Sequence, residues 1–156
     1  MKRSVRIILF AAALLTLSGC VNKFKQVKIT SAAIESLSPS GMKRFDAVVA
    51  LGIDNPAPSF NIMNLKADVR KDTVAILHLT GENVAVQGKS SKVYRVPVTA
   101  EIDPSVSLLQ LAIMARNFNP ELYVVDLSAK AMVAGVGKNL VYNDIPLSSL
   151  LEKASQ

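Results

Sequence analysis

The chain has 156 residues and a formal charge of +6, and three basic residues, Lys2, Arg3 and Arg6, lie in an N-terminal leader whose removal leaves +3. A domain of this length can bury a core of its own, and so mild a charge, without a concentrated basic stripe, gives no indication of nucleic-acid binding. Cys20 is the only cysteine, so no disulfide can form within the chain.

Residues 1–19 have the form of a secretory signal peptide. The basic residues are followed by an unbroken apolar run from Ile7 to Leu15 and then by small residues, which is the order that such a leader requires. The apolar run is too short for a membrane-spanning helix, which needs roughly 20 residues. We therefore expect cleavage of the leader and export of the remaining chain.

The last residues of the leader give a sharper prediction. Leu17-Ser18-Gly19-Cys20 resembles the lipobox of bacterial lipoproteins. The resemblance implies a diacylglyceryl group on the sulfur of Cys20, cleavage before this residue and a further acyl chain, such as palmitate, on the new amine. Two or three chains would give firm attachment, because each buried methylene contributes ~0.8 kcal/mol. The alternatives are an ordinary thiol beside a conventional cleavage site and a simple apolar anchor.

Residues 20–26 are expected to form a tether between the lipid and the folded domain. Lys23, Lys25 and Lys28 lie in or beside it, and the simplest interpretation is that they are solvated. Alternatively they rest against anionic headgroups, which contributes up to ~1 kcal/mol per residue. Val21 follows the cysteine, with no aspartate. The lipoprotein resemblance then favours the outer membrane of a bacterial cell envelope, with the domain facing the periplasm.

Period-two alternation of apolar residues predicts a mainly β fold after the tether. Short strands separated by turns indicate an antiparallel β-sandwich. The first strand is irregular, so we expect a bulge or two short strands there, and Pro97 predicts an edge position or a bulge. A turn is expected at Gly135-Val136-Gly137. The predicted strands are 27–37, 45–53, 63–70, 73–79, 84–86, 94–102, 123–133 and 139–145.

One segment lacks this alternation. Asp103-Pro104 is typical of an N-cap residue followed by proline at the first helical position, and the residues after it are mostly apolar. This predicts a helix over residues 104–117, inserted before the late strands and packed over the sandwich. A second short helix is expected over residues 147–153.

The order of these elements resembles the type-2 late embryogenesis abundant domain, also called the water-stress and hypersensitive-response domain. Its most specific part is Asn55-Pro56 after an alternating strand; the resemblance covers residues 27–148 and leaves 149–156 as a C-terminal tail. It implies an immunoglobulin- or fibronectin type III-like sandwich with one helix, a link to stress tolerance and no catalytic residues. The chain departs from the family pattern around Ala57-Pro58-Ser59. A generic envelope β-sandwich is the alternative.

No combination of residues indicates an enzyme, a metal or a cofactor. The single histidine, His78, lacks partners in the sequence for a zinc site or a serine triad, and we interpret it as a hydrogen-bonded or exposed strand residue. A cleft with His78 flanked by acids would revive the enzyme hypothesis. Asp54, Asp103 and Asp144 each fall at a strand end and could meet to bind calcium, although such residues more often cap helices or stabilise turns.

The sequence therefore predicts a non-enzymatic, membrane-anchored module that binds a protein or a hydrophobic molecule, or protects under stress. Asn55-Pro56 either fixes a loop that a partner recognises or simply ends its strand. The alternative function is a carrier of a lipid or another apolar ligand, with Leu108, Leu111 and Met114 lining a cavity beneath the helix. A filled interior with an apolar surface patch would favour the binding module, and an accessible apolar pocket would favour the carrier.

Overall fold

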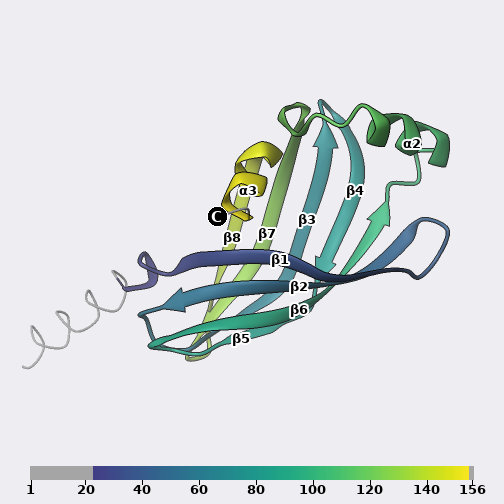
Figure 1. Cartoon of the computed structure of the whole chain (residues 1–156). Coiled ribbons are helices and arrows are strands. Elements are labelled where there is room, and N and C mark those ends of the chain that lie inside the picture. Colours follow the sequence, from purple (N-terminus) through teal and green to yellow (C-terminus); the bar gives the residue numbers. More distant parts are fainter. Residues whose placement is uncertain (1–22, 155–156) are drawn as a thin grey trace, which may run out of the picture.

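The computed structural model describes residues 23–154, and these form one open antiparallel sheet of eight strands (Figure 1). The strand order is β1-β2-β6-β4-β3-β7-β8, with β5 paired to the first residues of β3. The mainly antiparallel β fold predicted from the sequence is confirmed. The strands are β1 (Lys28–Pro39), β2 (Arg44–Asn55), β3 (Phe60–Lys71), β4 (Val74–Gly81), β5 (Val84–Val86), β6 (Ser90–Ile102), β7 (Tyr123–Val133) and β8 (Val136–Pro146).

The single sheet bends into two layers, which gives it a sandwich-like shape. Figure 1 shows β1, β2 and β6 crossing the direction of β3, β4, β7 and β8. β6 joins the layers: it pairs with β2 along nearly its whole length but with β4 only from Val98 to Ile102. β1 and β8 are left as the two edges of the sheet.

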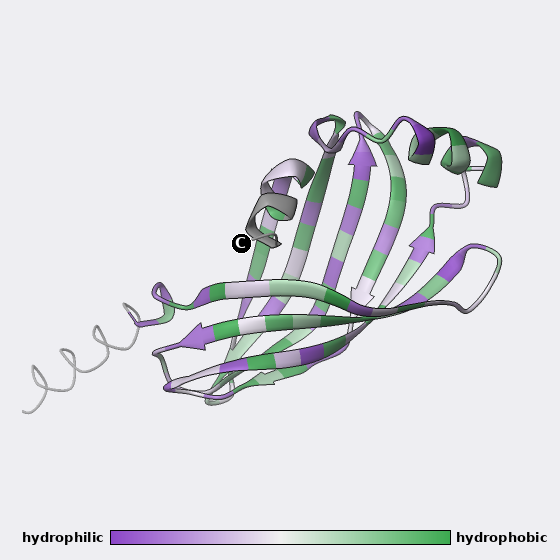
Figure 2. Ribbon diagram, in the orientation of Figure 1, coloured by the Kyte–Doolittle hydropathy of each residue, from purple (hydrophilic) through white to green (hydrophobic). Residues whose placement is uncertain are grey.

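The core lies between the layers and is built from alternate residues of the strands, which appear as alternating bands in Figure 2. Side chains of adjacent strand residues point to opposite faces, so a period of two places one set inside. Several core residues are alanines, which fit where the layers approach closely. The buried apolar residues include Ala50, Ile53, Ala67, Ile76, Val86, Val96, Ala100, Ile102, Tyr123 and Val125.

The irregular pattern of the first strand is explained by two register shifts. β1 pairs with β2, and the pairing slips between Ile29 and Ser31 and again between Ile34 and Ser36. The predicted bulge is confirmed. Because each bulge reverses the parity of the residues that follow it, the apolar side chains cannot keep one face, and Ile29 and Ile34 are exposed.

Pro97 lies at a local edge of β6, as predicted, because at this residue β6 has a strand partner on one side only. β6 pairs with β2 in regular register past Pro97, whereas its pairing with β4 covers only Val98 to Ile102. The ladder with β4 ends at Val98, and the Pro97 carbonyl accepts a hydrogen bond from the Glu82 N–H, just beyond β4. Because Pro97 has no backbone N–H, it fits at this position, where no residue of β4 needs a hydrogen bond from it.

The turn between the last two strands also differs from the prediction. It consists of Ala134 and Gly135, both with positive φ (47° and 82°), and Val133 pairs directly with Val136. Two left-handed residues give the hairpin geometry that matches strand twist. β8 therefore begins at Val136 rather than near residue 139, because Gly137 belongs to the strand and not to the turn.

The inserted helix is shorter and more exposed than predicted. α2 (Leu108–Arg116) begins after an N-cap at Ser107, whose side chain accepts from the Gln110 N–H while the Gln110 side chain accepts from the Ser107 N–H. This capping box overrides the Asp103-Pro104 signal. No α2 residue is buried, so the prediction that the helix packs over the sandwich is wrong.

Two further helical segments complete the fold. A 3-10 turn, η1 (Pro120–Leu122), leads into β7, and α3 (Leu147–Ala154) follows β8, which confirms the predicted C-terminal helix. α3 contacts β1, β7, β8 and η1 on the side of the molecule where the sheet is open. Within residues 23–154, no helix has the length and apolar character needed to cross a bilayer.

Candidate functional site

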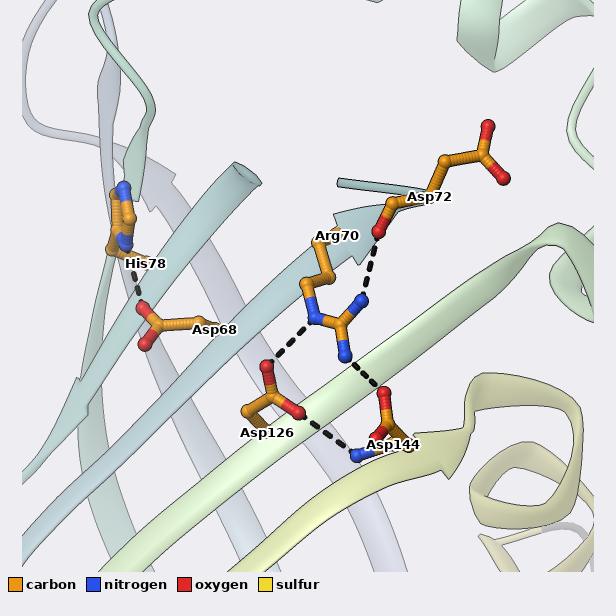
Figure 3. A network of polar contacts seen from close by, with 6 residues as sticks. All are labelled: Asp68, Arg70, Asp72, His78, Asp126 and Asp144. Carbon is orange, nitrogen blue, oxygen red and sulfur yellow. Dashed lines mark hydrogen bonds and ion pairs between the residues drawn. The ribbon is translucent and has the colours of Figure 1, made fainter. Parts of the chain in front are cut away.

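Two clusters of charged side chains lie on the polar face of the sheet, toward the end that carries α2 (Figure 3). They arise from the register of the strands. Asp68 of β3 pairs with Asp126 of β7 on one side and with His78 of β4 on the other, and His78 pairs with Glu101 of β6. Cross-strand partners point to the same face, so charged residues from four strands form one row.

The His78 cluster consists of His78, Asp68 and Asp103. The ring Nδ1 lies 2.6 Å from an Asp68 oxygen and Nε2 lies 2.8 Å from an Asp103 oxygen. Ionised carboxylates only accept hydrogen bonds, so both ring nitrogens must carry a proton to satisfy them. The hydrogen bond with Asp68, followed by that with Asp103, raises the pKa of His78 above its usual 6.5. The interpretation of His78 as a hydrogen-bonded strand residue is confirmed.

The same cluster holds the segment that precedes α2. One Asp103 oxygen accepts from both the N–H (2.8 Å) and the hydroxyl (2.5 Å) of Ser105. These bonds, with that of His78, lower the pKa of Asp103 to about 2. Lys43 Nζ, from the β1–β2 loop, donates to the carbonyl of Val106 at 2.7 Å and to that of Pro104 at 3.2 Å. The connection between β6 and α2 is therefore fixed by side chains from three elements.

The Arg70 cluster joins β3, β7 and β8. The Arg70 guanidinium donates from Nε to Asp126 at 2.8 Å, from Nη1 to the Asp72 carbonyl and from Nη2 to Asp144 (Figure 3). Asp126 also accepts from the Asp144 N–H at 2.8 Å. The guanidinium beside Asp126 lowers the pKa of that carboxyl. The cluster fixes the bulge in β8, where Asp144 has a positive φ of 57°.

The acids proposed for calcium do not meet. Asp54 pairs with Lys28 and Ser91 at one end of the β2–β6 ladder, whereas Asp103 follows the other end of β6. Asp144 is engaged by Arg70 in the other layer. Among the described residues, no group of three or more histidine, cysteine or acidic side chains is arranged to hold a metal ion.

At the opposite end, Asn55 connects two loops. Its side chain is completely buried; its Oδ1 accepts from the Ala57 N–H at 2.9 Å, and its Nδ2 donates to the carbonyls of Gln87 (2.9 Å) and Pro58 (3.3 Å). The β2–β3 loop is thereby attached to the β5–β6 turn. Asn55 thus does more than end its strand: it positions neighbouring loops.

Gly88 completes this connection by close approach. A Cβ at Gly88 would lie 2.6 Å from the Ser59 nitrogen and 2.8 Å from the Ala57 carbonyl oxygen, so only glycine fits. The Gly88 N–H donates to the Ser59 hydroxyl, and the Lys89 N–H donates to the Ala57 carbonyl. These contacts place the β5–β6 turn firmly beside the β2–β3 loop.

Two of the depressions in the described surface are lined neither by His78 nor by α2. The larger, about 610 Å³, is open, has a mixed polar and apolar lining, and lies across β1, β2, β4 and β6 around Asp46, Thr80 and Thr99. The smaller, about 230 Å³, is mostly apolar and lies between Phe60, Gln87 and Ala134. Asp68 and Asp103, which flank His78, line neither of these depressions, and both ring nitrogens of His78 are hydrogen-bonded to carboxylates.

Several large apolar side chains of α2 and of the residues after it are exposed to solvent. Leu109 is 71% exposed, Ile113 53% and Leu108 47%, and Phe118 and Leu122 are exposed beside them in sequence. Figure 2 shows this helix as mostly hydrophobic. We call Leu108, Leu109, Ile113, Phe118 and Leu122 the α2 surface.

Sequence reasoning missed both charged clusters, and it missed that α2 is displayed. The Asp68–His78 pair was within reach, because both residues lie in a hairpin closed at Asp72. A register shift between Val69 and Arg70, however, moves the pairing by one residue. Cys20, the predicted lipid-attachment residue, lies outside the described residues.

Comparisons with known proteins add support for the fold alone. No protein-family model matches the chain, and no curated protein is similar to it in sequence. A protein from Archaeoglobus fulgidus, known from a crystal structure, superposes with a TM-score of 0.51 at 9% identity, over 74% of this chain and 91% of that one. A β-glucuronidase of glycoside hydrolase family 2 gives a TM-score of 0.36 at 14% identity, over 73% of this chain and 11% of the glucuronidase. This chain is thus similar in fold to a β-rich archaeal protein.

Proposed function

We propose that this protein is a non-enzymatic lipoprotein of the bacterial cell envelope, attached through lipid on Cys20 and facing the periplasm, with the outer membrane as the favoured site. It acts as a binding or stress-protective module and presents the α2 surface to a protein partner. The observation that carries this proposal is the α2 surface itself, because monomeric proteins rarely expose contiguous apolar side chains without a use for them. The resemblance to the type-2 late embryogenesis abundant domain is part of the proposal.

The placement of the α2 surface supports a protein partner. In Figure 1 the first described residues and α2 lie at opposite ends of the molecule, so a chain held at its N-terminus directs α2 away from the bilayer. The Asp103 and Lys43 contacts fix the base of the helix, which reduces the entropy that binding would cost.

The alternative function, a carrier of an apolar ligand, has less support. A ligand pocket is usually an enclosed cavity of roughly 300 Å³ or more. The apolar depression near Phe60 measures about 230 Å³. Leu108, Leu111 and Met114 belong to a helix without buried residues, so they do not form the cavity that a carrier would use.

The binding function is tested by photo-crosslinking in intact envelopes. A photoreactive amino acid is placed at Leu109 in the full chain, and at the exposed Lys66 of β3 as a matched control. We expect one recurrent protein neighbour from position 109, none from position 66, and loss of the neighbour when Ile113 is changed to serine. Recovery of a lipid without a protein neighbour would contradict the binding module.

The anchor is tested separately with Cys20→Ser. We expect this variant to accumulate as a precursor that retains residues 1–19, because processing follows lipid attachment in the lipoprotein class that the lipobox resembles. Mass spectrometry of the purified native chain should show acyl mass on a polypeptide that begins at residue 20. Normal maturation of the serine variant would overturn the anchor.

A further inference from the structure

The charged residues are divided unevenly between the two ends of the molecule. The N-terminal end consists of the segment from Lys23 to Lys28 and the turns after β2, β5 and β7, with the strand residues beside them. Its basic residues come from three separate parts of the chain, with Asp54 as the acidic residue among them. They are Lys23, Lys25, Lys28, Lys89, Lys92, Lys130 and Lys138.

The rest of the described chain has the opposite sign. Apart from the residues of the N-terminal end, residues 23–154 contain eight basic and eleven acidic side chains, a formal charge of −3. The N-terminal end carries seven lysines and one aspartate, a formal charge of +6. The mild overall charge therefore hides a molecule with one strongly basic end.

The basic end is held together by specific contacts. The ring of Phe24 packs edge-on against Phe60 of β3, with 5.8 Å between the centroids, so the predicted tether contacts the body of the domain at Phe24. Phe60 pairs with Val86 of β5, and its neighbour Asn61 pairs with Met132 of β7. Figure 1 shows these turns gathered beside the first described residues.

The positions of the lysines at this end favour contact with an anionic surface outside the protein. Lys89 occupies an exposed turn with a positive φ of 51°. Lys130 and Lys138 lie on the two arms of the β7–β8 hairpin, close to the turn at Ala134. Val136, at the start of β8, is 74% exposed. Lysines near an exposed apolar side chain are a combination that associates with anionic lipid.

We infer that the N-terminal end is a docking surface for anionic phospholipid headgroups, which the lysines of the β5–β6 and β7–β8 regions contact together with those of the segment from Lys23 to Lys28. This inference rests on the proposed lipid anchor for the position of the bilayer. The lipid anchor attaches the protein to the bilayer, and the lysines orient the folded domain on it. The rest of the described chain, with its charge of −3, is repelled from the same surface, which favours the same orientation of the molecule.

The test uses the full chain, purified from envelopes and reconstituted into phosphatidylcholine vesicles with or without phosphatidylglycerol. A fluorescent amino acid replaces Ala134 in the β7–β8 turn or Ala112 on α2, and a headgroup-attached quencher reports contact. We expect strong quenching at position 134 in anionic vesicles, weak quenching at position 112, and weakening of the former by salt.

Charge variants decide whether the lysines are responsible. Lys89→Gln with Lys130→Gln and Lys138→Gln should reduce quenching at position 134 to its level in neutral vesicles. At ~1 kcal/mol per lysine, the docking equilibrium falls by up to about 100-fold. The control, Lys66→Gln with Lys71→Gln and Arg116→Gln, removes the same charge elsewhere and should leave quenching unchanged. Equal effects of the two variants, or equal quenching in neutral vesicles, would overturn the inference.

Mass spectrometry of the same samples separates this inference from the anchor. Acyl mass with no charge-dependent contact at position 134 refutes the docking surface and leaves the lipoprotein intact. If acyl mass is absent, the anchor is refuted, and the lysine variants still decide the docking surface by the same quenching.

Discussion

Asn55 has a polar side chain that is completely buried. Its hydrogen bonds to the Ala57 N–H and to the Gln87 carbonyl join two loops. Its position after an alternating strand was visible in the sequence, but its partner Gln87 was not, because the two residues are 32 positions apart. The sequence therefore predicted where the strand ends and could not predict that the loop is attached to a second turn.

Asn55→Ala is expected to lower the free energy of unfolding by about 3 kcal/mol, because it leaves the Ala57 N–H and the Gln87 carbonyl buried without a partner. Urea denaturation measures the change. Asn139→Ala, at an exposed position of β8, serves as the control and should stay within about 0.5 kcal/mol of the parent. A similar loss in both variants would show that the contacts of Asn55 contribute little.

At the scale of elements, the His78 cluster joins β3 and β4 to the segment before α2. Its contribution depends on pH in both directions. The raised pKa of His78 makes the folded state bind a proton more tightly, so this stabilisation is complete below pH 6.5 and is lost as pH rises through the folded-state pKa. The lowered pKa of Asp103 adds stabilisation above about pH 4 that is lost as pH falls toward about 2.

The difference in unfolding free energy between the parent and His78→Gln should therefore be largest near about pH 5.5 and should shrink by about pH 9. We expect at most about 1 kcal/mol, because the His78 side chain is 40% exposed and water screens the pair. Urea midpoints at the two pH values measure it. A difference that is constant with pH would mean that His78 acts only by packing.

The strands and the helix show how far sequence patterns reach. β6 and β7 follow alternations that could be read directly, because burial on one face of a sheet imposes a period of two. The start of α2 was also within reach, since Ser107 and Gln110 have the spacing of a capping box. The exposure of α2 could not be predicted, because an apolar helix has the same composition whether it covers a core or binds a partner.

At the scale of the whole molecule, the open sheet ends in two edge strands, β1 and β8. Ile34 of β1 and Val141 of β8 are both more than 60% exposed, and edge strands with apolar side chains are templates for pairing between chains. The charge asymmetry is likewise a property of the whole fold, because its lysines come together only through the topology of the strands.

Ile34→Lys should reduce the association of the protein at high concentration without changing its unfolding midpoint, since the side chain is already in solvent. Light scattering as a function of concentration measures this. Met42→Lys makes an equivalent change in the loop between β1 and β2, where no strand edge is available, and should have a smaller effect. An equal effect of the two substitutions would assign the association to surface hydropathy in general.

The contact between Phe24 and Phe60 limits how far the folded domain can lie from the bilayer. Only four peptide units separate Cys20 from Phe24, a span of at most about 14 Å. β2 and β6, at about 3.3 Å per residue, extend roughly 40 Å from that end toward α2. With the proposed anchor, α2 is kept at a nearly constant height above the bilayer. A protein can therefore bind α2 only if its own binding surface lies at that distance from the bilayer. A longer linker between Cys20 and Phe24 would remove this restriction.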